Sequence, residues 1–564
     1  MVNVKNLFGM AVMATALVAC SSNDDLASNG HEGNQTGEAY ASFRINLPTT
    51  SGTRVAGNPT FDGGDAKEYE VKNGTILIFD NAGNFVTSAQ LGTMNPWTDV
   101  KVDGVTTAAI ATVKLSGDVT VGGDYQALVL LNNDAEALTP KVTLPTTKGT
   151  PYATWSAEAS NVNAEKYVST DGIFMANAPK YNGATSEPTT LVPIANICAS
   201  REEAQAKAAT TVYVERGLAK VTMQNYKTDG YTIAAGTTYA GDKVVITDWK
   251  LDVTNKSTYP VHQTGGLKDA WNQIWETGRF FDNTSSSFKR VYWGIDPNYD
   301  GSALQNLTAC QTAFNMIKNS EVKGEAGKDH PQYCLENTFD LANMMQGQTT
   351  RVVFKAVYTP KALEGTTEKT FYKIGNNTAI WTKANLEKQI HTVAVTAMGI
   401  TDAAEQAKYV VKLDATENNI SGVAGQHLIK AENITYTGEA TSKVDQTVVN
   451  TINEKLGLSA ATGIATYLNG EAYYIARIKH FNELTPWTAG VDEAYGTNNE
   501  NKFLGRYGVL RNNWYDLSVE SISGLGYPEV PEVKPTVPDD ENDQYINVEV
   551  KILSWAKRSQ SIYL

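Results

Sequence analysis

The sequence has few cysteines, few histidines and no cluster of basic residues, and each shortage excludes a class of protein. Four cysteines in 564 residues cannot supply the dense disulfide framework of a small secreted scaffold. None of the six histidines stands in a recognisable metal-binding motif. The formal net charge is −14, and no basic block is present to neutralise nucleic-acid phosphates. We therefore expect no bound metal and no nucleic-acid partner.

Long apolar runs are also missing, apart from one near the N-terminus. Leu7–Ala19 is apolar, follows Lys5 and is too short to span a membrane as a helix. Leu17–Cys20 (LVAC) then has the form of a bacterial lipoprotein signal, in which Cys20 is acylated and becomes the first residue. A plain secretory signal with a chance cysteine is the alternative. We predict a signal peptide over residues 1–20, followed by a polar tether.

Signatures of catalysis are missing too, since the chain has no nucleophile elbow, phosphate loop or dinucleotide-binding glycine pattern. Scattered carboxylates leave glycosidase chemistry open as an alternative. Cys334 and His330 are a weak candidate dyad on an irregular segment. Asp296–Gly301 (DPNYDG) matches the first half of a calcium loop, but Leu307 at its twelfth position favours a tight acidic turn. We predict a protein that is not an enzyme, with no catalytic residue and no cofactor.

Two further questions stay open in the sequence. Cys310 and Cys334 permit one disulfide, and three free buried thiols, including Cys198, are the alternative. Five tryptophans could form a sugar-binding platform: Trp249, Trp293, Trp381, Trp514 and Trp555. Their scatter along expected strands favours packing in the core instead.

The residues that the chain has in quantity favour β-structure. Tyrosine is abundant, at 27 residues, and hydrophobic residues make up 41% of the chain, enough for packed cores. Clusters of Gly, Pro, Asn and Asp separate the expected strands, as in a sandwich. The expected strands are 75–80, 125–132, 211–225, 243–254, 351–358, 472–480 and 517–522. We predict a mainly all-β chain of two β-sandwich domains, with helical insertions in the second at 267–275, 304–319 and within 384–470.

Two strands near the ends of the chain share one pattern. The apolar face of the first is Ala41, Phe43, Ile45 and Leu47, and that of the last is Ile546, Val548, Val550 and Ile552. Both alternate with polar residues, as half-buried strands do. Four prolines between residues 528 and 538 favour an extended arm that separates the last strand from the body. The last strand is therefore expected to reach another molecule.

A loop of small residues follows the first of these strands and carries Arg54 between Thr53 and Val55. Such a loop is a good place for proteolytic nicking, and Arg54 suits a trypsin-like cut. An ordinary surface arginine is the alternative. Arg44 is a competing basic site, but it lies within the patterned strand, where folding protects it.

Several segments, in order along the chain, resemble the fimbrillins, the shaft subunits of the type V pili of Bacteroidales bacteria. They are Leu17–Cys20, Phe174–Pro179, Val214–Val221, Trp249–Val261, Tyr292–Tyr299, Tyr333–Phe339, Arg506–Gly526 and the terminal INVEVKILSW. The likeness is strongest to the major shaft subunits of the short (minor) fimbriae of Porphyromonas-type bacteria. Each segment is modest alone, and the ordered set is specific.

The resemblance implies transthyretin-like sandwiches over 55–225 and 226–526, after a propeptide over 21–54. It also implies a lipidated precursor at the outer membrane, cleaved by an arginine-specific protease between Arg54 and Val55. Removal of the first strand then lets another copy donate its last strand. The donor region is 545–564, which includes Trp555, and it follows a Pro-rich arm over 527–544.

The resemblance also implies partners and a location. The partners are other copies in a head-to-tail polymer, tip and anchor pilins, and receptors on host or bacterial surfaces. The location is a fimbria on the cell surface, which supports adhesion and biofilm formation. The alternatives are a monomeric surface lipoprotein that binds glycans or a protein receptor, and a tip or anchor pilin.

Overall fold

The structure, a computed structural model, describes residues 38–48, 68, 70–92, 98–102, 105–133, 140–169, 172–183, 186–223, 227–267, 288–299, 304–323, 330–338, 343–413, 420, 424–480, 506–539 and 546–554. All of them belong to one compact unit, Gly37–Leu564. No helix in this described part of the chain is long and apolar enough to cross a membrane.

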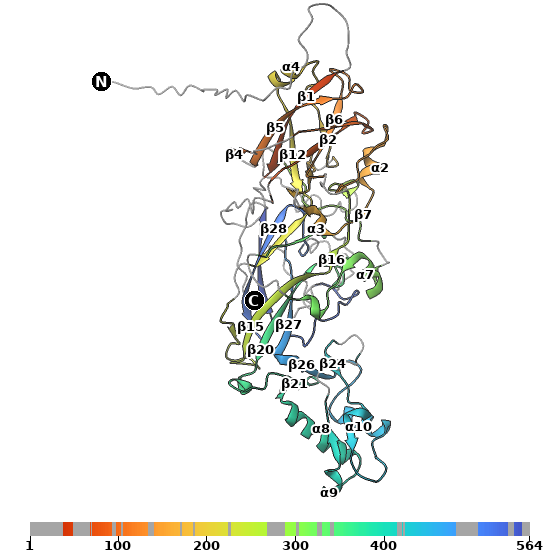
Figure 1. Cartoon of the computed structure of the whole chain (residues 1–564), viewed down its shortest axis with the longest axis vertical. Coiled ribbons are helices and arrows are strands. Elements are labelled where there is room, and N and C mark those ends of the chain that lie inside the picture. The colour runs from red at the N-terminus through yellow and green to blue at the C-terminus, as the bar shows by residue number, and fades with distance from the viewer. Residues whose placement is uncertain are drawn as a thin grey trace, which may run out of the picture. The chain divides into compact units, whose positions relative to one another are not determined.

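The first half of the chain forms a nine-stranded sheet in the order β3-β2-β6-β10-β12-β1-β5-β4, with β11 on β6 (Figure 1). Its strands are β1 (Ala39–Pro48), β2 (Gly74–Asp80), β3 (Phe85–Gln90), β4 (Thr98–Val102), β5 (Val105–Leu115), β6 (Tyr125–Leu131), β10 (Met175–Asn177), β11 (Val192–Pro193) and β12 (Thr210–Arg216). Side chains of β2, near one end, share a core with those of β5, near the other. The sheet therefore closes over its own apolar face as a sandwich.

The second half is built on two four-stranded sheets. One has the order β19-β13-β28-β29 and the other β14-β15-β20-β27. Their strands are β13 (Ala219–Met223), β14 (Tyr231–Thr232), β15 (Lys243–Asp252), β19 (Gln332–Cys334), β20 (Arg351–Thr359), β27 (Glu471–Arg477), β28 (Asn513–Ile522) and β29 (Ile546–Ser554). Trp249, Phe354 and Tyr515 from the two sheets meet in one core. The predicted mainly-β, sandwich-type fold is confirmed.

The chain passes from the first half to the second at Gly217 and Leu218. β12 pairs with β1 and β10, whereas β13 pairs with β19 and β28. A Cβ atom on Gly217 would meet Phe174 at 2.9 Å, so a larger residue would disturb the packing at this crossing. The sequence predicts one strand over 211–225 and a boundary near residue 226. The apolar pattern runs on without a break, so it does not show where the partner strands change.

Residues 371–467 form a smaller mixed region with its own core. The sheet β22-β21-β26-β24 packs with α8 (Lys383–Ala397) and α10 (Gln446–Lys455) around Leu386, Ile390 and Ile452. Thr382 and Asp445 cap the two helices. The remaining elements are β21 (Phe371–Ile374), β22 (Ile380–Trp381), α9 (Ala403–Gln406), β23 (Tyr409–Val411), β24 (Gln426–His427), β25 (Ile434–Tyr436) and β26 (Ile464–Tyr467). The predicted helical character of 384–470 is confirmed.

Short elements connect these parts. They are α2 (Tyr152–Ser156), β7 (Ser160–Asn161), α3 (Ala164–Tyr167), β8 (Val168–Ser169), β9 (Gly172–Ile173), α4 (Arg201–Ala206), β16 (Thr254–Asn255), β17 (Ser257–Thr258), α7 (Leu307–Ala313), β18 (Phe314–Asn315) and 3-10 turns at 319–321, 361–363, 431–433 and 468–470. Of the helix expected over 304–319, only α7 forms, because β18 pairs with β16 directly after it. The helix expected at 267–275 lies almost wholly outside the described residues.

Candidate functional site

β1 is an inner strand of the first sheet. It pairs antiparallel with β5 along its whole length, from Ala39 to Pro48. On its other side it pairs parallel with β12, from Phe43 to Asn46 (Figure 1). Both edges of β1 thus carry backbone pairing, so its removal would leave β5 and β12 with facing unpaired edges.

One face of β1 lies in the core of the first sandwich. Ala41, Phe43 and Ile45 are fully buried, among side chains from β2, β5, β6 and β12. These are three of the four residues that the sequence placed on the apolar face. For the fourth, Leu47, only the backbone is described, and it lies opposite Thr107 of β5.

The polar face of β1 is covered as well. Ser42 is 6% exposed, and its hydroxyl donates to the carbonyl of Ala204 in α4 at 2.8 Å. The same hydroxyl lies 2.8 Å from that of Thr112. Asn46 is 3% exposed. The alternating pattern predicted a half-buried strand; Arg44 on this face is partly exposed, but Ser42 and Asn46 are buried, and α4 packs over Ser42, so the face is covered more than predicted. The signal in the sequence was the short, uncharged side chains at 42 and 46.

β29 lies in a different sheet from β1. It pairs antiparallel with β28 of its own chain, with Ile546 opposite Ile522 and Ser554 opposite Asn513. It is the last strand of that sheet, so only one of its edges is paired within the described residues. Ile546, Val548, Val550 and Ile552 therefore form a strand, as the sequence predicts. Cys20, Arg54, Val55 and Trp555 lie outside the described residues.

The Pro-rich segment before β29 is held against the body as far as Asp539. Tyr527 exchanges two backbone hydrogen bonds with Tyr473, at 2.7 and 2.8 Å. The Arg351 guanidinium donates to the carbonyl of Pro531 at 2.8 Å, and Asp539 pairs with buried Arg506 at 3.3 Å. The prolines predict an arm that separates the strand from the body, and the described part of this segment differs from that prediction. An extended backbone leaves its peptide groups free to bond the body, and the local pattern does not reveal such partners.

Glu68 anchors the chain downstream of the expected cleavage site. It is 0% exposed and pairs with Lys220 of β13 at 2.6 Å. Arg216 of β12 donates to its backbone carbonyl at 2.8 Å, and the Tyr333 hydroxyl donates to its carboxylate at 2.5 Å. A cut between residues 49 and 67 would free β1 from the chain while these buried contacts hold Glu68 in place. No local pattern around Glu68 predicts this anchor, because its partners lie far away in the chain.

A second buried ionic group lies beside this anchor. Glu215 of β12 binds His262 and Arg290, each at 2.7 Å. Burial alone would raise the pKa of Glu215, but these neighbours outweigh it and lower that pKa to about 2. Arg511 forms a bidentate pair with Glu336. Removal of one partner from a buried ion pair strongly destabilises a protein. These pairs therefore hold the crossing between the two halves in place.

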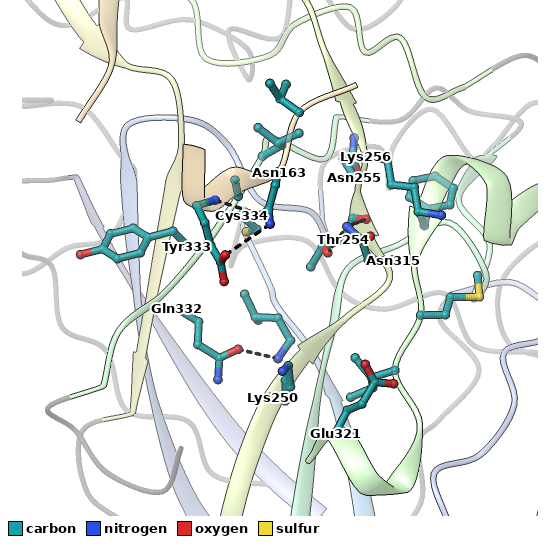
Figure 2. Close-up of a pocket in the computed structure, with 18 of the residues that line it drawn as sticks. Asn163, Lys250, Thr254, Asn255, Lys256, Asn315, Glu321, Gln332, Tyr333 and Cys334 are labelled. Carbon is teal, nitrogen blue, oxygen red and sulfur yellow. Dashed lines mark hydrogen bonds between the residues drawn. The ribbon is translucent and has the colours of Figure 1, made fainter. Parts of the chain in front are cut away.

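A groove of about 920 Å³ lies between α3, β15, β18 and β19 (Figure 2). The Gln332 side chain crosses it, accepting from the Leu251 N–H at 3.0 Å and donating to the Trp249 carbonyl at 3.1 Å. Cys334 lies at its wall, and burial raises the pKa of this thiol to about 12. Because Cys334 is neutral and buried while His330 is exposed, the two do not form a catalytic dyad.

The other candidate residues of the sequence are structural. Cys198, Cys310 and Cys334 are free and buried. Trp249 and Trp293 are 0% exposed and Trp514 is 8%, so these three belong to the core and not to a sugar platform. Asp296 is buried and accepts hydrogen bonds from the backbone of Asn298 and Thr338. Among the described residues, no group of three His, Cys, Asp or Glu side chains could hold a metal ion.

Comparison with known proteins points to one family at the C-terminal end. Residues 465–561 match the family described as "Major fimbrial subunit protein type IV, Fimbrillin, C-terminal". This end of the chain is therefore similar to the C-terminal part of fimbrillins. The matched segment contains β27, β28 and β29, and so includes the edge strand. No curated protein matches the sequence significantly.

Two solved structures from Parabacteroides distasonis are similar to the chain. A cell adhesion protein has 10% identity and a TM-score of 0.38, covering 92% of this chain and 98% of its own. A fimbrial assembly protein has 13% identity and a TM-score of 0.25, covering 56% of this chain and 80% of its own. At these TM-scores the similarity supports no conclusion about fold or mechanism.

Proposed function

We propose that this protein is a structural subunit of a surface fimbria and that it polymerises by strand exchange. A cut by an arginine-specific protease after Arg54 releases β1, and β29 of a second copy takes its place. The observation that carries this proposal is the position of β1. It is an inner strand of the first sheet and precedes Arg54 in the sequence, so a cut after Arg54 separates it from the rest of the chain.

The anchor at Glu68 makes such a cut selective. Residues 38–48 depend on β5, β12 and α4 for their position, whereas Glu68 is tied into the body by Lys220 and Arg216. After cleavage between Arg54 and Val55, the mature chain keeps Glu68 and its buried contacts. The strand itself is then held only by noncovalent contacts and can be replaced.

The vacated site strongly favours a new strand. Burial of Ala41, Phe43 and Ile45 provides apolar contacts of roughly 1.5–3 kcal/mol for each large side chain, and each backbone hydrogen bond adds about 0.5–1.5 kcal/mol. A groove that exposes such a surface together with two unpaired edges invites β-augmentation. The acceptor groove and the donor strand are different surfaces, so the contact is heterologous and repetition builds a filament.

The finer assignment follows the resemblance of the sequence. The protein is proposed as the major shaft subunit of a short fimbria of the Porphyromonas type, made as a precursor lipidated at Cys20 and held at the outer membrane. Its partners would be other copies, tip and anchor pilins, and receptors that support adhesion and biofilm formation. The strand β29 and the basic site Arg54 favour a shaft subunit over a tip or an anchor. Burial of Trp249, Trp293 and Trp514 counts against the glycan-binding alternative, whereas Trp381 is half-buried.

The variant Arg54→Ala tests the proposal in the producing cell. We expect surface-extracted wild-type protein to begin at Val55 and to form fibres, visible as a ladder of oligomers on gels. Arg54→Ala should keep its N-terminal segment and form no fibres. Arg44→Ala is the matched control, because this arginine lies within paired β1, and it should be cleaved normally. Fibres built from subunits that still begin at acylated Cys20 would contradict the proposed cleavage after Arg54.

A further inference from the structure

The groove around β1 imposes one register on the strand that replaces it. We infer that the incoming strand of a second copy runs in the direction of β1, with Asn547 at the place of Ser42. This inference rests on the proposed function, and it specifies the contact between the two copies. Apolar contacts alone cannot set this register, because they repeat every two residues and a slip by two keeps the apolar face inward.

The two strands match residue by residue in this register. Tyr40–Leu47 (YASFRINL) and Tyr545–Ile552 (YINVEVKI) align without a gap, beginning with tyrosine in both. Each apolar residue of one falls on an apolar residue of the other, and each polar residue on a polar one. Ile546 is larger than Ala41 while Val548 is smaller than Phe43, so the changes in volume offset each other, as packed cores require.

The site of Ser42 accepts only a short side chain that can both donate and accept. The hydroxyl is 6% exposed, donates to the Ala204 carbonyl and meets the Thr112 hydroxyl, each at 2.8 Å. The amide of Asn547 has an NH₂ group to donate to that carbonyl and an oxygen to accept from Thr112. Asparagine therefore replaces serine with both contacts retained.

The neighbouring registers place unsuitable residues at this site. A slip of two residues one way brings Glu549 against the Ala204 carbonyl, where an ionised carboxylate cannot donate and would be buried. A slip the other way brings Tyr545, whose ring is far larger than the serine side chain that is buried beside α4. The least matched pair in the inferred register is Lys551 at Asn46, which is 3% exposed. A long lysine stem lets its ammonium group reach solvent near the end of β1.

The same direction as β1 also keeps the backbone pairing of the sheet. β1 is antiparallel to β5 and parallel to β12, and these two ladders place their hydrogen bonds differently. A strand in the opposite direction would be parallel to β5 and antiparallel to β12, so the hydrogen-bond pattern on both sides would have to change. Among the described residues β29 pairs with one neighbour, β28, whereas in the groove it would pair with two. The second neighbour favours transfer from the edge to the groove.

Disulfide cross-linking between copies tests the register. One full-length precursor carries Thr112→Cys and a second carries Asn547→Cys, in a Cys198→Ser background because Cys198 bonds the backbone of Tyr40. The two are mixed, cleaved and allowed to assemble. The hydroxyls of Ser42 and Thr112 face each other at 2.8 Å, so cysteines at these two places are close enough for a disulfide. We expect a covalent dimer from this pair, and none from Thr112→Cys with Tyr545→Cys or Glu549→Cys.

The outcomes separate the register from the proposed function. Fibres that cross-link through position 545 or 549, or through none of the three, would overturn the inferred register while leaving strand exchange in place. If the wild-type chain forms no fibres after cleavage, the proposed function itself fails.

Substitutions at residue 547 give a second readout. Asn547→Ser should assemble like the wild type, because the groove already holds a serine in the precursor. Asn547→Leu leaves the Ala204 carbonyl unpaired and should slow assembly on the order of tenfold or more. Equal assembly rates for the serine and leucine variants would contradict the role of this site in selecting the register.

Discussion

Phe43→Ala distinguishes the precursor from the subunit that has lost β1. The ring of Phe43 is 0% exposed in the core of the first sandwich. Removal of a buried phenylalanine side chain lowers the free energy of unfolding by about 3–5 kcal/mol, as lost transfer energy and a residual cavity together. Under the proposed strand exchange, only the uncut precursor needs this side chain. The loss is therefore expected in the precursor and not in the fibre, where another strand fills the groove.

Equilibrium urea unfolding of the uncut precursor measures the effect. The midpoint of the transition that reports the first sandwich should fall, with its slope unchanged. Leu131→Ala is the matched control, because Leu131 of β6 lies in the same core at 0% exposure and remains after cleavage. This control should cost about 2–5 kcal/mol and should weaken precursor and fibre alike.

The rate of assembly gives an independent check. A strand bound about 3 kcal/mol less tightly leaves its groove on the order of a hundredfold more readily, since each 1.4 kcal/mol is a factor of ten. Phe43→Ala precursors should thus form fibres sooner after cleavage than the wild type, and Leu131→Ala precursors should not share this gain. An unchanged precursor midpoint for Phe43→Ala, alongside a lowered one for Leu131→Ala, would refute the placement of β1 in the core.

Two further predictions concern buried charges. Lys220→Met removes the buried ion pair of Glu68 and should lower the free energy of unfolding by about 3–5 kcal/mol. Lys243 pairs with Glu364 at a half-exposed site, so Lys243→Met should change the free energy of unfolding by less than about 1 kcal/mol. Equal effects of the two substitutions would refute the role of Glu68 as an anchor. Burial raises the pKa of Asp296 to about 7, so the folded chain holds a proton that the unfolded chain releases near pH ~4, and stability should fall as pH rises between these values. Asp296→Asn should flatten this fall in urea midpoints, and exposed Asp124→Asn should leave it unchanged.

The sequence predicted the elements whose signal lies within a few residues. The alternation in Tyr40–Pro48 and in Ile546–Ile552 marked β1 and β29. The helical character expected within 384–470 is met by α8 and α10. In each case one period of apolar residues is enough to specify the element.

The sequence did not predict features that depend on distant partners. Nothing near Glu68 shows that Lys220 and Tyr333 neutralise and bind its carboxylate. Nothing in the pattern of β1 shows that α4 covers its polar face. The division between β12 and β13 is equally hidden, because both strands are apolar and only their partners differ.

The short crossing at Gly217 and Leu218 bears on how a fibre would respond to tension. A donated strand is pulled at its N-terminal end by its own subunit, and β12, its parallel neighbour, is pulled at its C-terminal end through this crossing. β13 then passes the pull to β28, again across a parallel pair and again between opposite ends. Two strands pulled in this way slide against each other, so all the hydrogen bonds between them resist together and do not open one by one. The joint between subunits and the interior of each subunit would thus resist extension by the same shear geometry.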